Sequence, residues 1–216
     1  MTRLLALLLL AGSLVLLGAA AFHPILPLTA EGDLGLMAHT PHWRLIHLGL
    51  MYATGLIIAG VWARWLIADP AERAPLGVAL LVVTIGEALH GVNITYMAGA
   101  GTEFAAAHAS GADVREVYLA SHAAAIMTGR LGGFLVALGA GLVAWVTSRS
   151  GRDPRWLVGL AAVTCVVGLA GNFFAVPGQP LMVASIGLMA LWQAATAVRV
   201  LREPSAISRQ VSGDGR

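Results

Sequence analysis

Six long apolar stretches alternate with short polar ones along the chain. They cover roughly residues 4–22, 44–67, 75–98, 119–147, 156–176 and 181–201. A helix rises about 1.5 Å per residue, so each stretch can cross the roughly 30 Å hydrocarbon core of a bilayer. The stretches are continuously apolar rather than alternating, which disfavours a β-barrel. The pattern predicts an all-α integral membrane protein, a six-transmembrane-helix bundle.

The two ends of the chain need separate interpretation. We expect residues 1–202 to form a single transmembrane helical domain, and the polar residues 203–216 to form a flexible cytoplasmic tail. The first stretch follows Arg3 and ends in small residues, which fits a cleaved secretory signal. It is long for a signal, so we favour a retained helix. Cleavage would leave five helices.

Composition agrees with a membrane location. The chain has 216 residues, of which 58% are hydrophobic and 11% charged, whereas a soluble domain carries about 25% charged residues. Its mean hydropathy is +0.80. The arginines flank apolar stretches instead of forming a basic patch, so we expect no nucleic acid as a partner. The expected partner is the lipid bilayer, and a homo-oligomer or a membrane-complex partner stays open.

Arginine placement predicts the orientation. If the helices alternate in direction, ten arginines fall on one side of the membrane. Only Arg44 and Arg115 fall on the other side, and Arg130 lies inside the fourth stretch. The arginine-rich side of a membrane protein faces the cytoplasm. Both termini are then cytoplasmic, and we expect a cell membrane of the bacterial inner-membrane type.

Polar side chains interrupt the apolar stretches on the outer side. In GEALHGVNITY, residues 86–96, the side chains of Glu87, His90 and Asn93 recur every three positions and share one helix face. His47 and His122 begin neighbouring helices at the same side of the membrane. The other four histidines are expected to be loop residues of the same side: His23, His39, His42 and His108. The sequence thus predicts an outer polar layer centred on His47, His90 and His122.

Two charged residues lie close to the predicted midplane. Glu87 and Arg130 would each cost at least about 2.5–3.5 kcal/mol in the bilayer centre. Mutual pairing is the least costly arrangement, so we predict a structural ion pair between them. Beside Arg130, Gly129 and Gly133 form a small-xxx-small pair that lets a neighbouring helix or a flat ligand approach the backbone.

Haem binding with electron transfer is the first functional hypothesis. Two histidines at matching depth on neighbouring helices can ligate a b-type haem, as in membrane cytochromes generally. The candidate cofactor-binding residues are His47, His90, His122 and Arg130, with the arginine meeting a propionate. The ligand pair would be His47 with His122, or His90 with either.

Another metal ion is the second hypothesis. Copper, zinc and iron all accept imidazole ligands, and Glu87-x-x-His90 has the spacing of di-iron bundles. The candidate metal ligands are His47, His90, His122 and Glu87. A second Glu-x-x-His is absent from the sequence, which weakens the di-iron version.

A small transporter or a non-catalytic subunit of a membrane complex is the third hypothesis, since midplane polar residues mark transport paths. These residues can equally be structural. In particular, Asn172 and Gln193 are expected to make interhelical hydrogen bonds. No motif of a hydrolase or metalloprotease is present, so the sequence assigns no reaction. We also expect helical segments in the outer connections 23–42 and 99–118, where they would cover the polar layer.

Overall fold

The computed structural model describes residues 1–24, 30–175 and 180–203, and this part of the chain is all-helical. Six of its helices are long and apolar enough to cross a membrane, as the sequence predicted. In chain order the elements are α1 (Thr2–Phe22), α2 (Ala30–His39), α3 (Trp43–Gly60), α4 (Ala63–Leu66), α5 (Pro70–Tyr96), the π-helical turn η1 (Met97–Gly101), α6 (Thr102–Ala109), α7 (Arg115–Ser150), α8 (Arg155–Phe174) and α9 (Pro180–Leu201).

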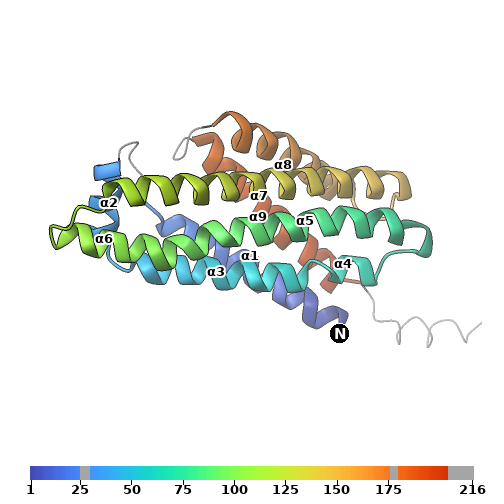
Figure 1. Cartoon of the computed structure of the whole chain (residues 1–216). Helices are drawn as coiled ribbons and strands as arrows, with labels where there is room; N and C mark the ends of the chain where they lie inside the picture. Colours follow the sequence, from blue (N-terminus) through green and yellow to red (C-terminus); the bar gives the residue numbers. More distant parts are fainter. Residues whose placement is uncertain (25–29, 176–179, 204–216) are drawn as a thin grey trace, which may run out of the picture.

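The two central helices are longer than the sequence predicted. α5 begins at Pro70 rather than at Pro75, and it continues through η1 and α6 as one rod (Figure 1). Pro75 lies inside α5, and its ring removes one backbone hydrogen bond without ending the helix. α7 has 36 residues and is therefore about 54 Å long. Both elements extend well beyond a 30 Å hydrocarbon layer.

Glycines set the contact between α5 and α7, which lie side by side through the middle of the molecule (Figure 1). A Cβ atom added to Gly86 would meet the carbonyl oxygen of Gly132 at 2.7 Å. A Cβ atom added to Gly132 would meet the carbonyl oxygen of Gly86 at 2.6 Å. Only hydrogen side chains permit this approach of two backbones. α8 packs on α7, while α1 packs between α3 and α9.

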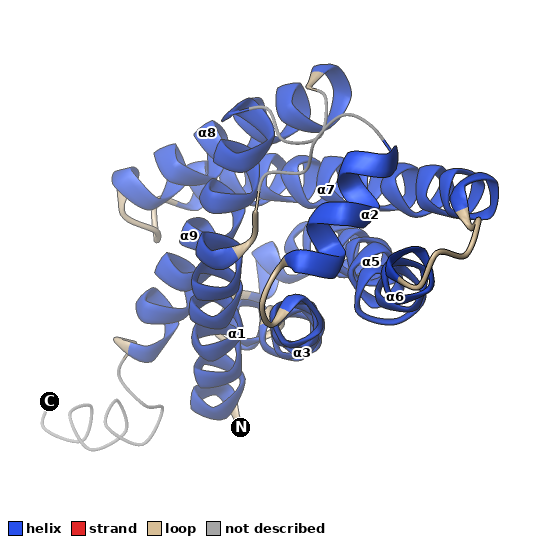
Figure 2. Cartoon of the chain, turned by 90° about the vertical axis from the view of Figure 1, so that its left-hand side faces the viewer, coloured by secondary structure: helices blue, strands red, loops and turns tan. Residues whose placement is uncertain are grey.

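One end of the bundle carries a cap, which we define as α2, α6 and the first two turns of α7. Figure 2 shows α2 lying over this end, where it packs on α6 and α7. The predicted helical segments in the two long connections are thus present. A small hydrophobic core holds the cap together: Leu34, Met37, Trp43, Met97, Ala105 and Tyr118.

Ion pairs join the elements at the opposite end of the bundle. The buried Arg64 of α4 contacts Asp153 at 3.2 Å and Glu72 at 3.9 Å. Arg199 of α9 approaches the same aspartate at 3.7 Å. These contacts tie α4, α5, the α7–α8 connection and α9 together. The predicted tail lies outside the described residues from position 204 onward, as does position 176 at the end of the fifth predicted helix.

Candidate functional site

Two histidines meet ring to ring where α1 ends and α3 begins. The Nε2 atoms of His23 and His47 are 3.1 Å apart. Each ring also bonds a backbone carbonyl through Nδ1: His23 to Pro24 at 2.7 Å, and His47 to Trp43 at 3.0 Å. His47 is 2% exposed. The sequence singled out His47 as a ligand but treated His23 as a loop residue.

The carbonyl bonds determine which ring nitrogen carries hydrogen. A carbonyl oxygen can only accept, so both Nδ1 atoms must be donors. In two neutral rings, each Nε2 atom then presents a lone pair, and the lone pairs of His23 and His47 face each other at hydrogen-bonding distance. Two acceptors at this separation repel unless a cation lies between them. A proton or another cation between the two nitrogens would relieve this repulsion.

An aromatic side chain lies beside both rings of the pair. The Trp43 ring lies 4.2 Å from that of His47 and 5.2 Å from that of His23, centroid to centroid. Burial lowers the pKa of His23 below its usual value, although its bond to the Pro24 carbonyl opposes this effect. Neutral His23 is thus favoured near pH 7.

His122 lies in a different environment, beneath α2. Its ring stacks on Tyr118 with centroids 4.8 Å apart, and its Nε2 atom is 3.7 Å from Oδ2 of Asp33. The Tyr118 hydroxyl donates to the same oxygen at 3.3 Å. Burial raises the pKa of Asp33 to about 6, despite the opposing effect of the tyrosine hydrogen bond. This cluster fastens α2 to α7, and the sequence pattern gave no sign of Asp33.

The predicted ion pair between Glu87 and Arg130 is wrong. Glu87 is 2% exposed and accepts a hydrogen bond from Nε2 of Gln193 on α9 at 2.5 Å. Its second carboxyl oxygen has no hydrogen-bond partner among the described residues. The prediction of an interhelical bond by Gln193 is confirmed, but its partner is the acid that we had assigned to the arginine.

Arg130 turns instead toward the end of α8. Its Nε donates to the carbonyl of Asn172 at 2.9 Å, and its Nη2 donates to the carbonyl of Phe173 at 3.1 Å. The last carbonyls of a helix lack intrahelical donors and form the negative end of its dipole, so a cation is stabilised there. This is the physical reason why Arg130 needs no carboxylate. Asn172 itself donates to Ser185 on α9 at 3.1 Å, as predicted for an interhelical amide.

His90 lines a small cavity between α5, α7, α8 and α9. The cavity has a volume of about 80 Å³, and its polar lining comes from His90, Asn93, Arg130 and Asn172. Gly129 and Gly133 form its floor, where added Cβ atoms would collide with the side chains of Asn93 and Asn172, respectively. The predicted small-residue pair thus admits two asparagines from neighbouring helices.

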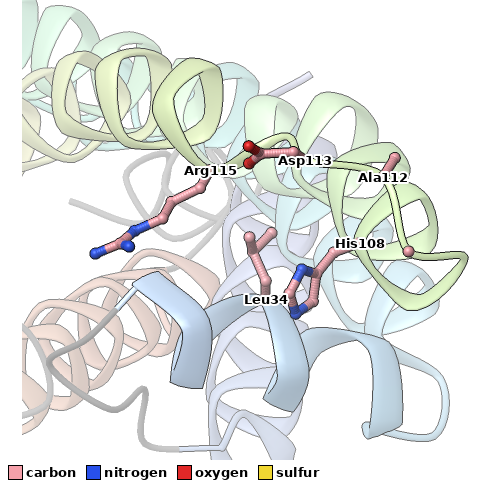
Figure 3. A pocket seen from close by; sticks show the side chains of 6 residues that line it. Leu34, His108, Ala112, Asp113 and Arg115 are labelled. Atoms are coloured by element: carbon pink, nitrogen blue, oxygen red, sulfur yellow. The ribbon is translucent and has the colours of Figure 1, made fainter.

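A second cavity, of about 240 Å³, opens at the cap between α2 and the α6–α7 connection. Leu34 of α2 and His108 of α6 approach each other along it (Figure 3). Asp113 borders it from the connection, and Arg115 borders it from the start of α7. No buried polar atom without a partner lines this cavity among the described residues. It therefore offers less for a specific ligand than the two histidine environments.

The structure distributes the predicted polar layer over three places. His47 meets His23, His122 meets Asp33, and His90 faces its own cavity. Within the described ranges, no group of three or more His, Cys, Asp or Glu side chains is placed to hold a metal ion. The predicted ligand set of His47, His90, His122 and Glu87 is thus not assembled around one centre. No known protein family matches the chain, and neither a curated protein nor a solved structure shows significant similarity to it.

Proposed function

We propose that this chain is an integral membrane protein that binds an exchangeable transition-metal ion at its outer face, through His23 and His47. The observation that carries the proposal is the 3.1 Å separation of the two Nε2 atoms, with both Nδ1 atoms engaged by carbonyls. A metal-bound histidine usually donates its other ring N–H to a carbonyl or carboxylate, which fixes the ring tautomer. Here both rings have one.

The separation of the two nitrogens suits a metal ion in size. Metal–imidazole bonds are about 2.0–2.1 Å long, so a 3.1 Å gap corresponds to an N–metal–N angle of about 100°. This angle lies between those of square-planar and tetrahedral coordination, which Cu²⁺ and Zn²⁺ prefer respectively. Neither ring has to move far to bind. Imidazole ligation favours copper or zinc over magnesium or calcium.

Two protein ligands among the described residues leave the remaining coordination positions to water or to a molecule that brings the ion. Structural zinc sites have four protein ligands, so an incomplete set indicates binding that exchanges. We infer a role in acquiring or handing on a metal ion at the membrane surface. Copper at this site would also permit electron transfer.

The outer location of this site rests on the orientation. The arginine bias assigns the end that carries α4 to the cytoplasm, and the cap with the histidine pair to the opposite side. Large apolar side chains exposed on the long helices, such as Leu14, Val92, Met127 and Val166, support contact with lipid. The N-terminus and the tail would then be cytoplasmic.

Copper titration tests the proposal. Protein freed of metal by a chelator should bind one Cu²⁺ or Zn²⁺ ion for each chain. His23→Gln and His47→Gln should each weaken binding at least about tenfold, or about 1.4 kcal/mol. The matched control is His39→Gln, an exposed residue that bonds the Gly35 carbonyl and should leave affinity unchanged.

Fluorescence gives a local readout of the same event. Cu²⁺ should quench Trp43, whose ring adjoins both histidine rings, and Trp43→Phe should remove that part of the quenching. Equal affinity in all three histidine variants would overturn the proposal. So would the absence of any uptake, which would leave a shared proton as the cation between the rings.

Haem binding remains a separate prediction. Each predicted axial pair would require His47 or His122 to leave the partners described above. The 80 Å³ cavity beside His90 is smaller than the roughly 300–1,000 Å³ of pockets that enclose drug-sized ligands. A Soret band after reconstitution with haem, lost in His90→Ala, would favour the haem interpretation over the metal-ion one.

A further inference from the structure

A second group of buried oxygen atoms without a hydrogen-bond donor lies in the middle of the bundle. Glu87 on α5 and Gln193 on α9 are 2% and 1% exposed, and one hydrogen bond of 2.5 Å joins them. Oε2 of Glu87 and Oε1 of Gln193 are both buried, and neither has a partner among the described residues. Leaving such a buried polar atom unsatisfied costs about 1–3 kcal/mol.

An ionised Glu87 fits this environment poorly. A carboxylate has only acceptors, so it can bond the amide nitrogen of Gln193 but not the amide oxygen. The cation nearest in expected depth, Arg130, is engaged by the end of α8. A buried charge without a counter-ion is strongly unfavourable.

We propose that Glu87 carries a proton on Oε2 and donates it to Oε1 of Gln193, so that the two side chains form a cyclic acid–amide pair. The amide nitrogen already donates to Oε1 of the acid. The added O–H···O bond would satisfy both orphan oxygens and remove the charge at once. Glu87 and Gln193 together then form a proton-binding site between α5 and α9, separate from the histidine pair at the cap.

Within the part of the chain that the structure describes, the ionisable groups of the neighbouring elements leave this pair without a charged partner. On α5, His90 is one turn away and lines its own cavity. α7 contributes Arg130, which bonds α8, and α3 contributes His47, which bonds His23. Arg64 of α4 pairs with Asp153 at the far end. α9 contributes Arg199, which belongs to that same far-end network.

Infrared spectroscopy of the whole protein in lipid tests the inference. The spectrum at about pH 8 should contain the C=O stretch of a protonated carboxyl group, although exposed acids and Asp33 are ionised there. The band should shift when glutamate is labelled with ¹³C. It should be lost in Glu87→Gln and should change frequency in Gln193→Leu, where the acceptor is removed. Glu103→Gln, an exposed acid on α6, is the matched control and should keep the band.

Two results would overturn the inference. The first is a wild-type spectrum at about pH 8 with no protonated carboxyl band, which needs no variant and is independent of how variants fold. The second is a band that persists unchanged in Glu87→Gln. That variant should fold, because an amide at position 87 can form the same two hydrogen bonds with Gln193.

Discussion

Replacing Gly132 with alanine tests the helix crossing on which the interior depends. The added Cβ atom would lie 2.5 Å from the backbone nitrogen of His90 and 2.6 Å from the carbonyl oxygen of Gly86. Comfortable contacts need about 3.5 Å, so α5 and α7 must separate by about 1 Å. Both obstructing atoms belong to the backbone and cannot rotate aside.

The magnitude follows from two opposing terms. Overpacking of a tight interior typically costs about 1–3 kcal/mol. Alanine in place of glycine gains about 0.5–1 kcal/mol within a helix. We therefore expect Gly132→Ala to lower the free energy of unfolding by about 1–2 kcal/mol. Gly159→Ala should not lower it, because on α8 the space around Gly159 is empty within 4 Å.

Reversible unfolding in mixed detergent micelles, followed by circular dichroism, measures both variants. The comparison uses the same residue change at a crossing and away from one. If Gly132→Ala is as stable as wild type, or if Gly159→Ala loses as much, the close approach of α5 and α7 is refuted.

Three other predictions concern the cap, the opposite end and the orientation. Because burial raises the pKa of Asp33 from 3.8 to about 6, docked α2 binds more protons than undocked α2, and docking weakens as the pH rises through that range. Hydrogen exchange of α2 amides should show that the free energy of docking falls by at most about 3 kcal/mol as the pH rises. Asp33→Asn should abolish this fall. Arg64→Leu should cost about 3 kcal/mol in unfolding, since it leaves buried Asp153 with one weaker partner. In a Cys165→Ala background, Ser110→Cys should react with an impermeant thiol reagent from outside, and Ser150→Cys only after permeabilisation.

Each of these has a control or a contrary outcome. Equal protection of α2 at pH 4 and pH 7 in the wild type would show that Asp33 does not govern docking. Arg149→Gln is the control for Arg64, because its guanidinium lies over exposed Trp145 at 4.3 Å and should matter by less than about 1 kcal/mol. Labelling of Ser150→Cys from outside, and of Ser110→Cys only after permeabilisation, would show the opposite membrane orientation, with the histidine pair on the cytoplasmic side.

Sequence periodicity could predict the helices and the faces that they share, but not which helix each face meets. The polar face of Glu87, His90 and Asn93 is continuous along α5, yet Glu87 meets α9 and Asn93 meets α7. A spacing of three residues rotates each side chain by about 60°, which is enough to reach different neighbours. The choice depends on the crossing at Gly86, which no pattern in one chain specifies.

The partners of Arg130 and His23 were both missed for the same reason, because the sequence alone does not show which groups folding brings next to a side chain. Arg130 is satisfied by backbone carbonyls at the end of α8, whose position is known only after folding. His23 reaches His47 because α1 and α3 are antiparallel neighbours and its ring turns back toward the bundle. The one sequence signal was that all seven histidines fall on one predicted side.

X-ray absorption by copper or zinc bound to the protein identifies the ligands of the ion. We expect one ion per chain with imidazole nitrogen ligands at about 2.0 Å. Two imidazoles should be present in the wild type and in His39→Gln, and one at most in His23→Gln or His47→Gln. A spectrum with no imidazole ligation, or one that is unchanged by both substitutions, would contradict the assignment of the His23–His47 pair as a metal site.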